Sequence, residues 1–496
     1  MSTIGKEAKD GSNDNNESQS ESKMSTNQAA RLAISLGLAG YRYGSPAVHV
    51  QSFVEKAFEK FTETAATSSS NSSDKEDGDD EKAIVVSDIT SKPKLVACCR
   101  LSQSECFLSI ETKEEENGSQ SQISEDFTAK KSFGPLVYMK AAQNGCHLDK
   151  LSRLSMLAEN LLTSSSSTTH YDACDIQSKL DAIETAPNPW GTILNFLAWV
   201  ACGVALPPVF GCTWPDIILG GVTATASFVI AYGIDLGCSM TTPGIVGRIA
   251  RRLAPWTSLL QAYQAAAIAS ICQAYWSNAT NPVLVTIGAI AIPLPGYGIS
   301  AGVIELAADN ITGGLSHIIK GLITLVLLAV GAALGIATGN AIQTPEPLQE
   351  NIVFVSNLWQ ILWLPMLCTA LAIALQNSPR DFIWSILCGG ITYAVSYGGA
   401  VLVPNRANIG YFFGGLALTV VSNIWGNVTR RSPLPLMIPS FILSISGSIG
   451  FRGLLNISKG SDGLGGEEFW QMFVVAGVTM AGILVGYFVV KPTNVL

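Results

Sequence analysis

Charged side chains are scarce in the last three fifths of this chain. Residues 190–496 hold 11 Lys and Arg and 10 Asp and Glu, whereas residues 1–189 hold 19 and 28. A long stretch with so little charge is typical of a membrane protein, because ionised side chains are costly inside a bilayer. We therefore predict a soluble, acidic N-terminal part followed by a membrane part.

Histidine and paired cysteine are scarce too. The chain has four His and eleven Cys, and no Cys-x-x-Cys pair. Neither the cysteines nor the histidines have a spacing that suits a zinc site. We therefore expect free thiols, no metal and no cofactor. Cys98 and Cys99 are adjacent, and neighbouring strand residues point to opposite faces, which disfavours a redox pair or a metal site there. Residues 1–24 contain no apolar run, so no cleavable secretory signal is expected.

Ten apolar segments follow Trp190. A membrane-spanning helix needs about 20 mostly apolar residues, and polar or Pro-rich breaks divide the rest of the chain accordingly. The predicted spans are 191–210, 215–237, 256–276, 282–304, 319–338, 352–375, 381–402, 409–427, 434–455 and 468–490. An even number of spans places both ends of the membrane part on one side.

The distribution of Lys and Arg orients these spans. With the soluble part in the cytosol, eight basic residues fall on the cytosolic side and three on or near the far side. The two sets are Arg248, Arg251, Arg252, Lys320, Arg380, Arg430, Arg431 and Lys491, against Arg406, Arg452 and Lys459. This excess predicts cytosolic N- and C-termini. A plasma membrane and a vacuole-like organelle are both compatible with the loops.

The fourth segment of each half is interrupted. Residues 289–298 read AIAIPLPGYG, and the corresponding segment of the second half contains Pro433-Leu434-Pro435, Pro439-Ser440 and Gly447-Ser448-Ile449-Gly450. Two halves of five spans each must be inverted relative to one another. Interrupted helices at matching positions of inverted halves are typical of a midplane binding site in a secondary transporter, although channels also use broken helices. Pro and Gly also serve kinks and close helix packing.

The soluble part is predicted to be a small α+β domain. Two helices are expected within 28–64 and two more at 147–163 and 171–186, with strands between them at 82–89, 95–101, 106–110 and 136–141. Tracts of Ser, Asn, Asp, Glu and Lys are expected to be disordered. The predicted organisation is a disordered tail (1–24), a cytosolic domain (25–189) with disordered inserts (66–82 and 113–132), and two five-helix repeats (190–340 and 341–496).

Acidic side chains near the first break are the candidates for proton coupling. Glu305 is the first choice, because a carboxyl group in apolar surroundings can exchange a proton in the working range. Asp309 lies four residues later, on the same helix face, and Asp235 ends the second span. The alternative is that Glu305 and Asp309 belong to an amphipathic helix and face water.

A zwitterionic substrate also needs a site for its carboxylate. Free N–H groups of the helices that begin after Pro295-Gly296 and after Pro439 could supply it, while Ser300, Ser440 and Asn310 could contact a hydroxyl group. The full set of candidate pathway residues is Pro295, Gly296, Ser300, Glu305, Asp309, Asn310, Gly314, Asp235, Pro439 and Ser440.

Other classes of function are weaker. Residues 298–302 match G-x-S-x-G, but a hydrolase elbow needs a preceding strand and a His/acid pair, so neither an enzyme nor catalytic residues are expected. A channel stays open as an alternative. So does a sensor or interaction protein whose soluble domain acts and whose membrane part is an anchor.

Two stretches carry a family resemblance. Residues 31–45, RLAISLGLAGYRYGS, resemble the opening of the threonine/serine exporter (ThrE) family, whose fungal relatives include pheromone-regulated membrane proteins. Residues 293–314, PLPGYGISAGVIELAADNITGG, are similar to the family's Pro-Gly turn, small-residue helix with an acid, and Asn-Ile-x-x-Gly end. The resemblance extends over most of residues 25–490.

This resemblance implies a multi-pass exporter of threonine-like and serine-like amino acids, driven by a proton gradient. By motif matching it implies pathway roles for Pro295, Gly296, Glu305, Asn310 and Gly314. The sequence departs from the family where Pro439-Ser440 replaces a Pro-Gly turn, and the two acidic inserts are not part of the family core. The expected partners are an amino acid, protons and the lipid bilayer. No nucleic acid is expected, and a homo-oligomer is compatible with this architecture.

Overall fold

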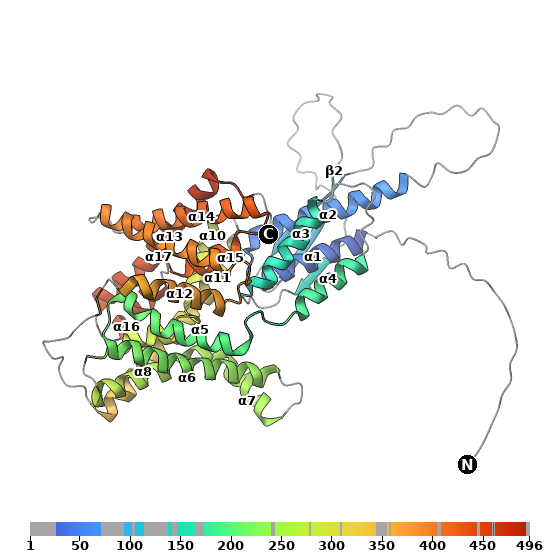
Figure 1. Cartoon of the computed structure of the whole chain (residues 1–496). Helices are drawn as coiled ribbons and strands as arrows, with labels where there is room; N and C mark the ends of the chain where they lie inside the picture. The colour runs from blue at the N-terminus through green and yellow to red at the C-terminus, as the bar shows by residue number, and fades with distance from the viewer. Residues whose placement is uncertain are drawn as a thin grey trace, which may run out of the picture.

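A computed structural model shows a small N-terminal part at one end of a larger helical bundle (Figure 1). The structure describes residues 26–70, 94–101, 105–113, 137–140, 146–163, 173–239, 244–276, 279–307, 310–343, 355–356, 359–403, 408–443, 447–458, 460 and 462–492. We call the end of the bundle that contacts the N-terminal part the docked end, and the opposite end the far end.

The N-terminal part consists of four helices and a small sheet. The helices are α1 (Thr26–Arg42), α2 (Ala47–Ser70), α3 (Leu148–Thr163) and α4 (Ala173–Thr185). The strands β1 (Lys94–Leu101), β2 (Glu105–Lys113) and β3 (Val137–Lys140) form an antiparallel sheet in the order β1-β2-β3. The predicted elements are present, except that the strand expected at 82–89 lies outside the described residues.

Only a small part of the inserts predicted to be disordered lies within the described residues. Helix α2 continues to Ser70, so the first five residues of the insert expected at 66–82 are helical. Most of that insert, nearly all of the second one and the tail at 1–24 lie outside the described residues.

The helices of the bundle follow the predicted segments. They are α5 (Gly191–Ala205), the 3₁₀ helix η1 (Pro207–Phe210), α6 (Trp214–Ser239), α7 (Ile245–Leu253), η2 (Ala254–Trp256), α8 (Thr257–Tyr275), α9 (Pro282–Ala289), α10 (Gly296–Ala307), α11 (Ile311–Ile342), α12 (Gln360–Ala374), α13 (Phe382–Leu402), α14 (Ile409–Thr429), α15 (Leu434–Leu443), α16 (Gly447–Ser458) and α17 (Asp462–Val489).

Seven helical stretches within the described residues are long and apolar enough to cross a membrane. They are 191–210, 214–239, 311–342, 382–402, 409–429, 434–458 and 463–489. Helix α8, the pair α9 and α10, and α12 fall short of these limits. The predicted count of ten spans and the inverted repeat are therefore not confirmed. Large apolar side chains such as Leu402 and Phe488 are exposed, as expected of a surface that faces lipid.

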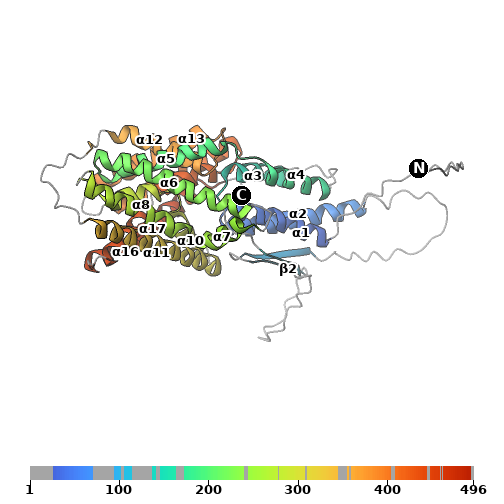
Figure 2. The same ribbon diagram turned by 90° about the horizontal axis from the view of Figure 1, so that it is seen from below.

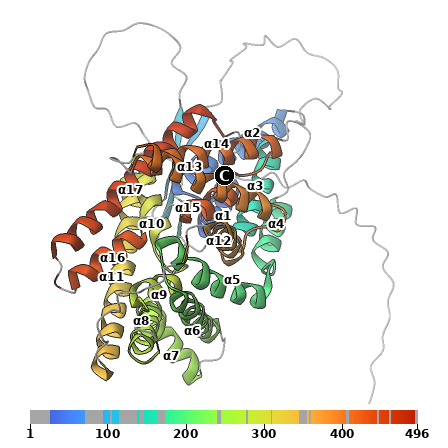
Figure 3. The same cartoon turned by 60° about the vertical axis from the view of Figure 1, so that its left-hand side comes forward.

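The second interrupted segment lies in the middle of the bundle. In the stretch 434–458, 86% of the apolar window is buried, against 28–50% for the other six stretches. Figure 3 shows α10, α12 and α15 near the centre, with α5, α6, α8, α11, α13, α14 and α17 around them. The interrupted helices thus occupy the protein interior, where freed backbone groups can be satisfied.

The first break is where the sequence predicts it, and the second is not. Helix α9 ends at Ala289 and α10 begins at Gly296. In the second half, α15 runs through Pro439 to Leu443, and α16 begins at Gly447. The prediction of a helix start after Pro439 is therefore wrong.

A contact distant in sequence explains why Pro439 is tolerated. Pro439 lacks an N–H group, so it leaves the carbonyl of Pro435 without its helical donor. The side-chain amide of Asn377 donates to that carbonyl oxygen, at 3.0 Å. Because the lost bond is replaced, the helix continues through Pro439 to Leu443.

Close backbone contacts at glycines hold the outer helices together. An added Cβ at Gly415 of α14 would overlap the carbonyl oxygen of Thr479 in α17, and one at Gly482 would overlap that of Phe412. Small residues at helix crossings give this kind of close packing in membranes.

Substituting one of these glycines should therefore destabilise the bundle. We expect Gly415→Val to lower stability by about 1–3 kcal/mol, the usual cost of overpacking, because the backbones of α14 and α17 would have to separate. Gly390→Val in α13 is the matched control, since an added Cβ there meets nothing within 4 Å. Thermal unfolding in detergent compares them, and equal melting temperatures would contradict the prediction.

Candidate functional site

The break between α9 and α10 borders a cavity at the docked end. This cavity has a volume of about 230 Å³. Its lining comes from the N-terminal part (Gly44, Ser45, Pro46 and Cys146), the break (Pro293 and Pro295), α10 (Tyr297, Gly298, Ala301 and Glu305) and α11 (His317, Lys320, Gly321 and Thr324). It therefore lies between the soluble part and the bundle. We call it the docked-end cavity.

Glu305 is the buried acid of this cavity. Its side chain is 1% exposed, and its Oε1 lies 3.5 Å from Nε2 of His317 on α11. The same histidine nitrogen lies 3.3 Å from the hydroxyl of Tyr41 on α1. The three groups form a connected path from a buried carboxyl group to the N-terminal part.

The start of α11 is shaped around this carboxylate. Asn310 caps the helix, its Oδ1 accepting from the N–H of Gly313 at 3.2 Å. An added Cβ at Gly313 would lie 2.5 Å from Oε2 of Glu305, so only glycine permits this approach. A carboxylate beside a helix N-terminus is stabilised by the helix dipole.

The break itself is bonded to the N-terminal part. The hydroxyl of Tyr297 donates to the carbonyl oxygen of Gly44, at 3.1 Å. Gly44 has a φ of 108°, a conformation that other residues rarely adopt. The turn between α1 and α2 thus presents its backbone to the interrupted helix.

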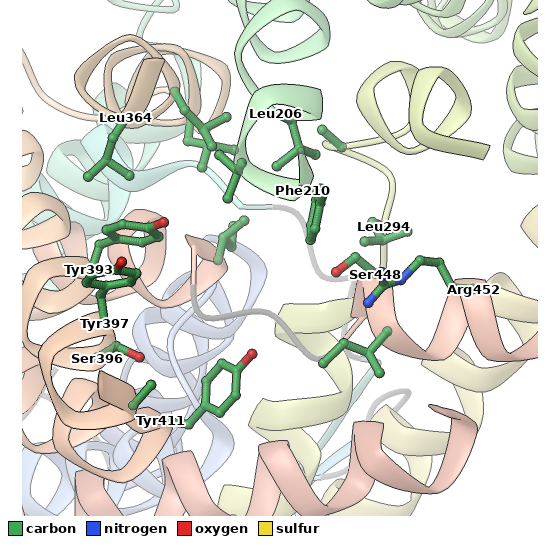
Figure 4. Close-up of a pocket in the computed structure, with 17 residues that line it drawn as sticks. Leu206, Phe210, Leu294, Leu364, Tyr393, Ser396, Tyr397, Tyr411, Ser448 and Arg452 are labelled. Carbon is green, nitrogen blue, oxygen red and sulfur yellow. The ribbon is translucent and has the colours of Figure 1, made fainter. Parts of the chain in front are cut away.

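A second cavity, of about 380 Å³, lies toward the far end (Figure 4). Leu206, which follows α5, and apolar side chains of η1 and α12 cover part of it. The polar lining consists of Tyr393, Ser396 and Tyr397 from α13, Tyr411 from α14, and Ser448 and Arg452 from α16. Figure 4 shows these side chains on opposite walls of one hollow. We call it the far-end cavity.

The two breaks separate the cavities. Leu294 lines the far-end cavity, whereas its neighbours Pro293 and Pro295 line the docked-end cavity. In the second interrupted segment, Ile442 lines the far-end cavity, and Phe441 lines a smaller pocket at the docked end together with Tyr297. Leu294, Phe441 and Ile442 thus form the barrier between the two cavities, which we call the partition.

Two family models match the chain on either side of its middle. Residues 135–339 match a model of threonine/serine exporters (ThrE), and residues 360–491 match a second model of this family (ThrE_2). The chain belongs to the threonine/serine exporter family.

Fungal members of this family are similar to the chain. Pheromone-regulated membrane protein 10 of Yarrowia lipolytica is 24% identical over 301 residues, which cover 57% of this chain and 23% of that protein. The protein of the same name from Candida albicans is 30% identical over 177 residues, 33% of this chain and 16% of that protein. The one from Eremothecium gossypii is 23% identical over 334 residues, 63% and 42% respectively. The chain thus spans less than half the length of these relatives. No solved structure matches it.

The structure gathers only some of the predicted pathway residues. Pro295 and Glu305 line the docked-end cavity, and Gly296 begins α10 beside it. Ser300 is buried in α10. At Gly314, an added Cβ would lie 2.7 Å from the carbonyl oxygen of Gly302, so this glycine serves the contact of α10 with α11.

The remaining candidates lie elsewhere. Ser440 is buried and donates to the carbonyl oxygen of Leu436, at 2.8 Å, within its own helix. Asp235 is exposed near the end of α6 and lines none of the described cavities. Asp309 lies outside the described residues.

Sequence reasoning misses the polar side chains of the far-end cavity. Arg452 enters the prediction only as a charge that orients the spans. Tyr393, Ser396 and Tyr397 recur at helical spacing in an apolar helix, which is the one sequence signal that points to this wall. The same spacing also fits polar side chains that pack between helices. Only the side chains on the other wall of the cavity, Ser448 and Arg452, distinguish the two cases.

The N-terminal part is also held to the bundle by a buried ion pair. Asp381, whose side chain is 1% exposed, lies 2.7 Å from the guanidinium of Arg431 and accepts from the hydroxyl of Ser152 on α3, at 3.2 Å. Three more bonds join the parts nearby, and the first runs from the N–H of Leu148 to the carbonyl oxygen of Leu375, at 3.2 Å. The N–H of Asp149 donates to the carbonyl of Gln376, at 2.8 Å, and the indole N–H of Trp190 donates to that of Asn377, at 2.7 Å.

The docking contact of His49 should make stability depend on pH. His49 on α2 packs edge-on against the ring of Tyr487, with 6.4 Å between ring centroids. Burial lowers the pKa of His49 below its ordinary value of 6.5. The folded protein thus favours the neutral ring. The contribution to stability is full above the unfolded pKa and is lost as the pH falls below it.

We therefore expect the melting temperature to decrease when the pH is lowered from about 7.5 to about 5.5. The decrease should be smaller in His49→Gln. Thermal unfolding of both proteins at the two pH values checks this. The comparison of pH slopes removes any constant effect of the substitution. The same slope in both proteins would contradict the prediction.

Proposed function

We propose that this chain is a secondary transporter that exports small polar amino acids of the threonine and serine class in exchange for protons. One observation carries the proposal: the buried pair of Glu305 and His317 lies in a cavity beside an interrupted membrane helix. Buried ionisable residues at such positions are typical of proton-coupled carriers.

The partition between the cavities supports a carrier. Hollows on the two sides of one thin barrier are what alternating access requires, because a small movement at the barrier would connect a site to one side or to the other. An open channel would need a continuous path. The barrier residues Leu294, Phe441 and Ile442 are apolar, so they would also exclude water and ions.

The directions of the interrupted helices support two inverted halves. The segment α9 to α10 runs toward the docked end, where Glu305 lies beside Gly44. The segment α15 to α16 runs the opposite way, since Leu434 packs with the core of α1–α4 and Arg452 lines the far-end cavity. The two family models also divide the chain between residues 339 and 360.

In this proposal the N-terminal part covers the cytosolic mouth of the pathway. Gly44, Ser45 and Pro46 form one wall of the docked-end cavity, so a substrate entering from the cytosol would have to pass beside them. The excess of Lys and Arg at this side supports the orientation. Figure 2 shows α1 and α2 beyond the ends of α10 and α11.

Flux measurements on the purified protein in lipid vesicles test the function. Labelled serine and threonine are followed with and without an imposed pH gradient. Accumulation against the concentration gradient, only when the pH gradient is present, is the expected result. Flux that is insensitive to the pH gradient and does not saturate would favour a channel. No flux of either amino acid would overturn the substrate class and favour a sensor.

A further inference from the structure

We propose that Arg452 and Ser448, at the start of α16, bind the carboxylate of the transported amino acid in the far-end cavity. This inference rests on the proposed function and adds to it a substrate site that lies apart from Glu305. It is carried by the charge of the cavity, the geometry of α16 and the chemistry of the opposite wall.

Within the described part of the chain, no carboxylate pairs with the charge of this cavity. Arg452 is the one charged side chain among the described residues that line it. Its Nε is buried and has no hydrogen-bond partner, and no carboxylate of the described part of the chain lies within ion-pair distance. Its guanidinium carbon lies 5.6 Å from the centroid of the Phe210 ring. Arg452 is half-buried, and its unpaired Nε can donate a charge-assisted hydrogen bond to an anionic ligand in the cavity.

The geometry of α16 adds donors to the same point. The helix begins at Gly447 and is 12 residues long. Ser448 lies in its first turn and Arg452 one turn later, so both side chains share a helix face. The Ser448 hydroxyl can donate to a carboxylate beside the guanidinium of Arg452. Figure 4 shows the Ser448 and Arg452 side chains close together on one wall of the hollow.

The opposite wall suits the rest of an amino acid. Tyr393, Ser396, Tyr397 and Tyr411 offer hydroxyl groups that can accept from an ammonium group or bond to a side-chain hydroxyl. Their rings can also face a cation. No acidic side chain is among the described lining residues, so an amine without a carboxylate would meet only the charge of Arg452. The charge of the lining therefore favours a ligand that carries an anionic group, and in an amino acid this group is the carboxylate.

Binding measurements on the full chain in detergent test the site. We expect serine to be displaced by threonine, but not by serinamide, which keeps the ammonium and hydroxyl groups and lacks the carboxylate. Arg452→Met should weaken serine binding at least about tenfold, and Arg452→Lys less, because a lysine keeps the charge but loses the bidentate geometry. Arg248→Met in α7, an exposed arginine, is the matched control and should bind as the unaltered protein does.

The outcomes separate this proposal from the proposed function. Displacement by serinamide as effective as by threonine, no binding of serine or threonine, or unchanged binding by Arg452→Met would overturn the carboxylate site. The serinamide comparison uses the unaltered protein, so it decides even where a variant fails to fold. Binding with these properties, but without flux driven by a pH gradient, would support the site and overturn the proton-coupled export.

Discussion

Glu305→Gln is expected to uncouple export from the proton gradient. A pH difference of one unit corresponds to about 1.4 kcal/mol, so one-for-one exchange can sustain a concentration ratio of about ten. Glutamine keeps the size of Glu305 and cannot bind or release a proton. The ratio reached in vesicles should therefore fall to about one, which corresponds to simple equilibration.

Two controls isolate this effect. Asp235→Asn changes an exposed acid near the end of α6 and should keep the full ratio. Glutamine at 305 still fits beside Gly313, so the melting temperature should stay close to that of the unaltered protein. A ratio near ten in Glu305→Gln would exclude this carboxyl group as the coupling site and favour another acid.

Arg431→Met is expected to cause the largest loss of stability. The substitution leaves the carboxylate of Asp381 buried, with Ser152 as its remaining side-chain partner of those described. Arg431 is 26% exposed, so the loss should be smaller than the typical cost of removing one partner of a fully buried ion pair, which is about 3–5 kcal/mol. Because Asp381 bonds to α3, the loss should also loosen the N-terminal part. Thermal unfolding and limited proteolysis at the link near Trp190 measure the two effects.

The exposed pair of Arg42 and Glu184 is the matched control. Both side chains are well exposed, at 45% and 38%, and such pairs contribute about 0–1 kcal/mol. Glu184→Gln should thus unfold close to the unaltered temperature. The double variant Asp381→Leu with Arg431→Met should recover much of the loss, since it leaves no unpaired buried charge. Equal losses in the single and double variants would argue against a charge effect.

Local chemistry made the first break predictable and the second one not. Pro293, Pro295 and Gly296 end α9 and start α10 wherever they are placed, because two prolines remove two donors within three residues. Pro439 breaks nothing, because Asn377 satisfies the carbonyl that it leaves open. That donor lies 58 residues away in sequence, and its position depends on the packed structure.

In the candidate site, too, local sequence predicts some features, and others depend on the packing of separate elements. The burial of Glu305 follows from its apolar neighbours in sequence, and the structure places it at 1% exposure. Its contact with His317 and that of Tyr297 with Gly44 depend on how separate elements dock. The far-end cavity is assembled from five or more elements, so no single segment contains its pattern. The sequence instead favours Ser440, whose hydroxyl bonds to the carbonyl oxygens of Leu436 in its own helix and of Ser385 in α13.

The glycine contacts also decide which parts of the molecule can shift. Helices α8 and α11 meet backbone to backbone at Gly331 and Gly335, as α14 and α17 do at Gly415. Sliding within such a pair would break these contacts, so each pair would move as one rigid body. Helix α15 contains no glycine. It joins the core of the N-terminal part, through Leu434, to the partition at its other end. A displacement of the soluble part would therefore reach the partition between the cavities along this ten-residue helix, and also through Tyr297 of α10, which bonds to Gly44.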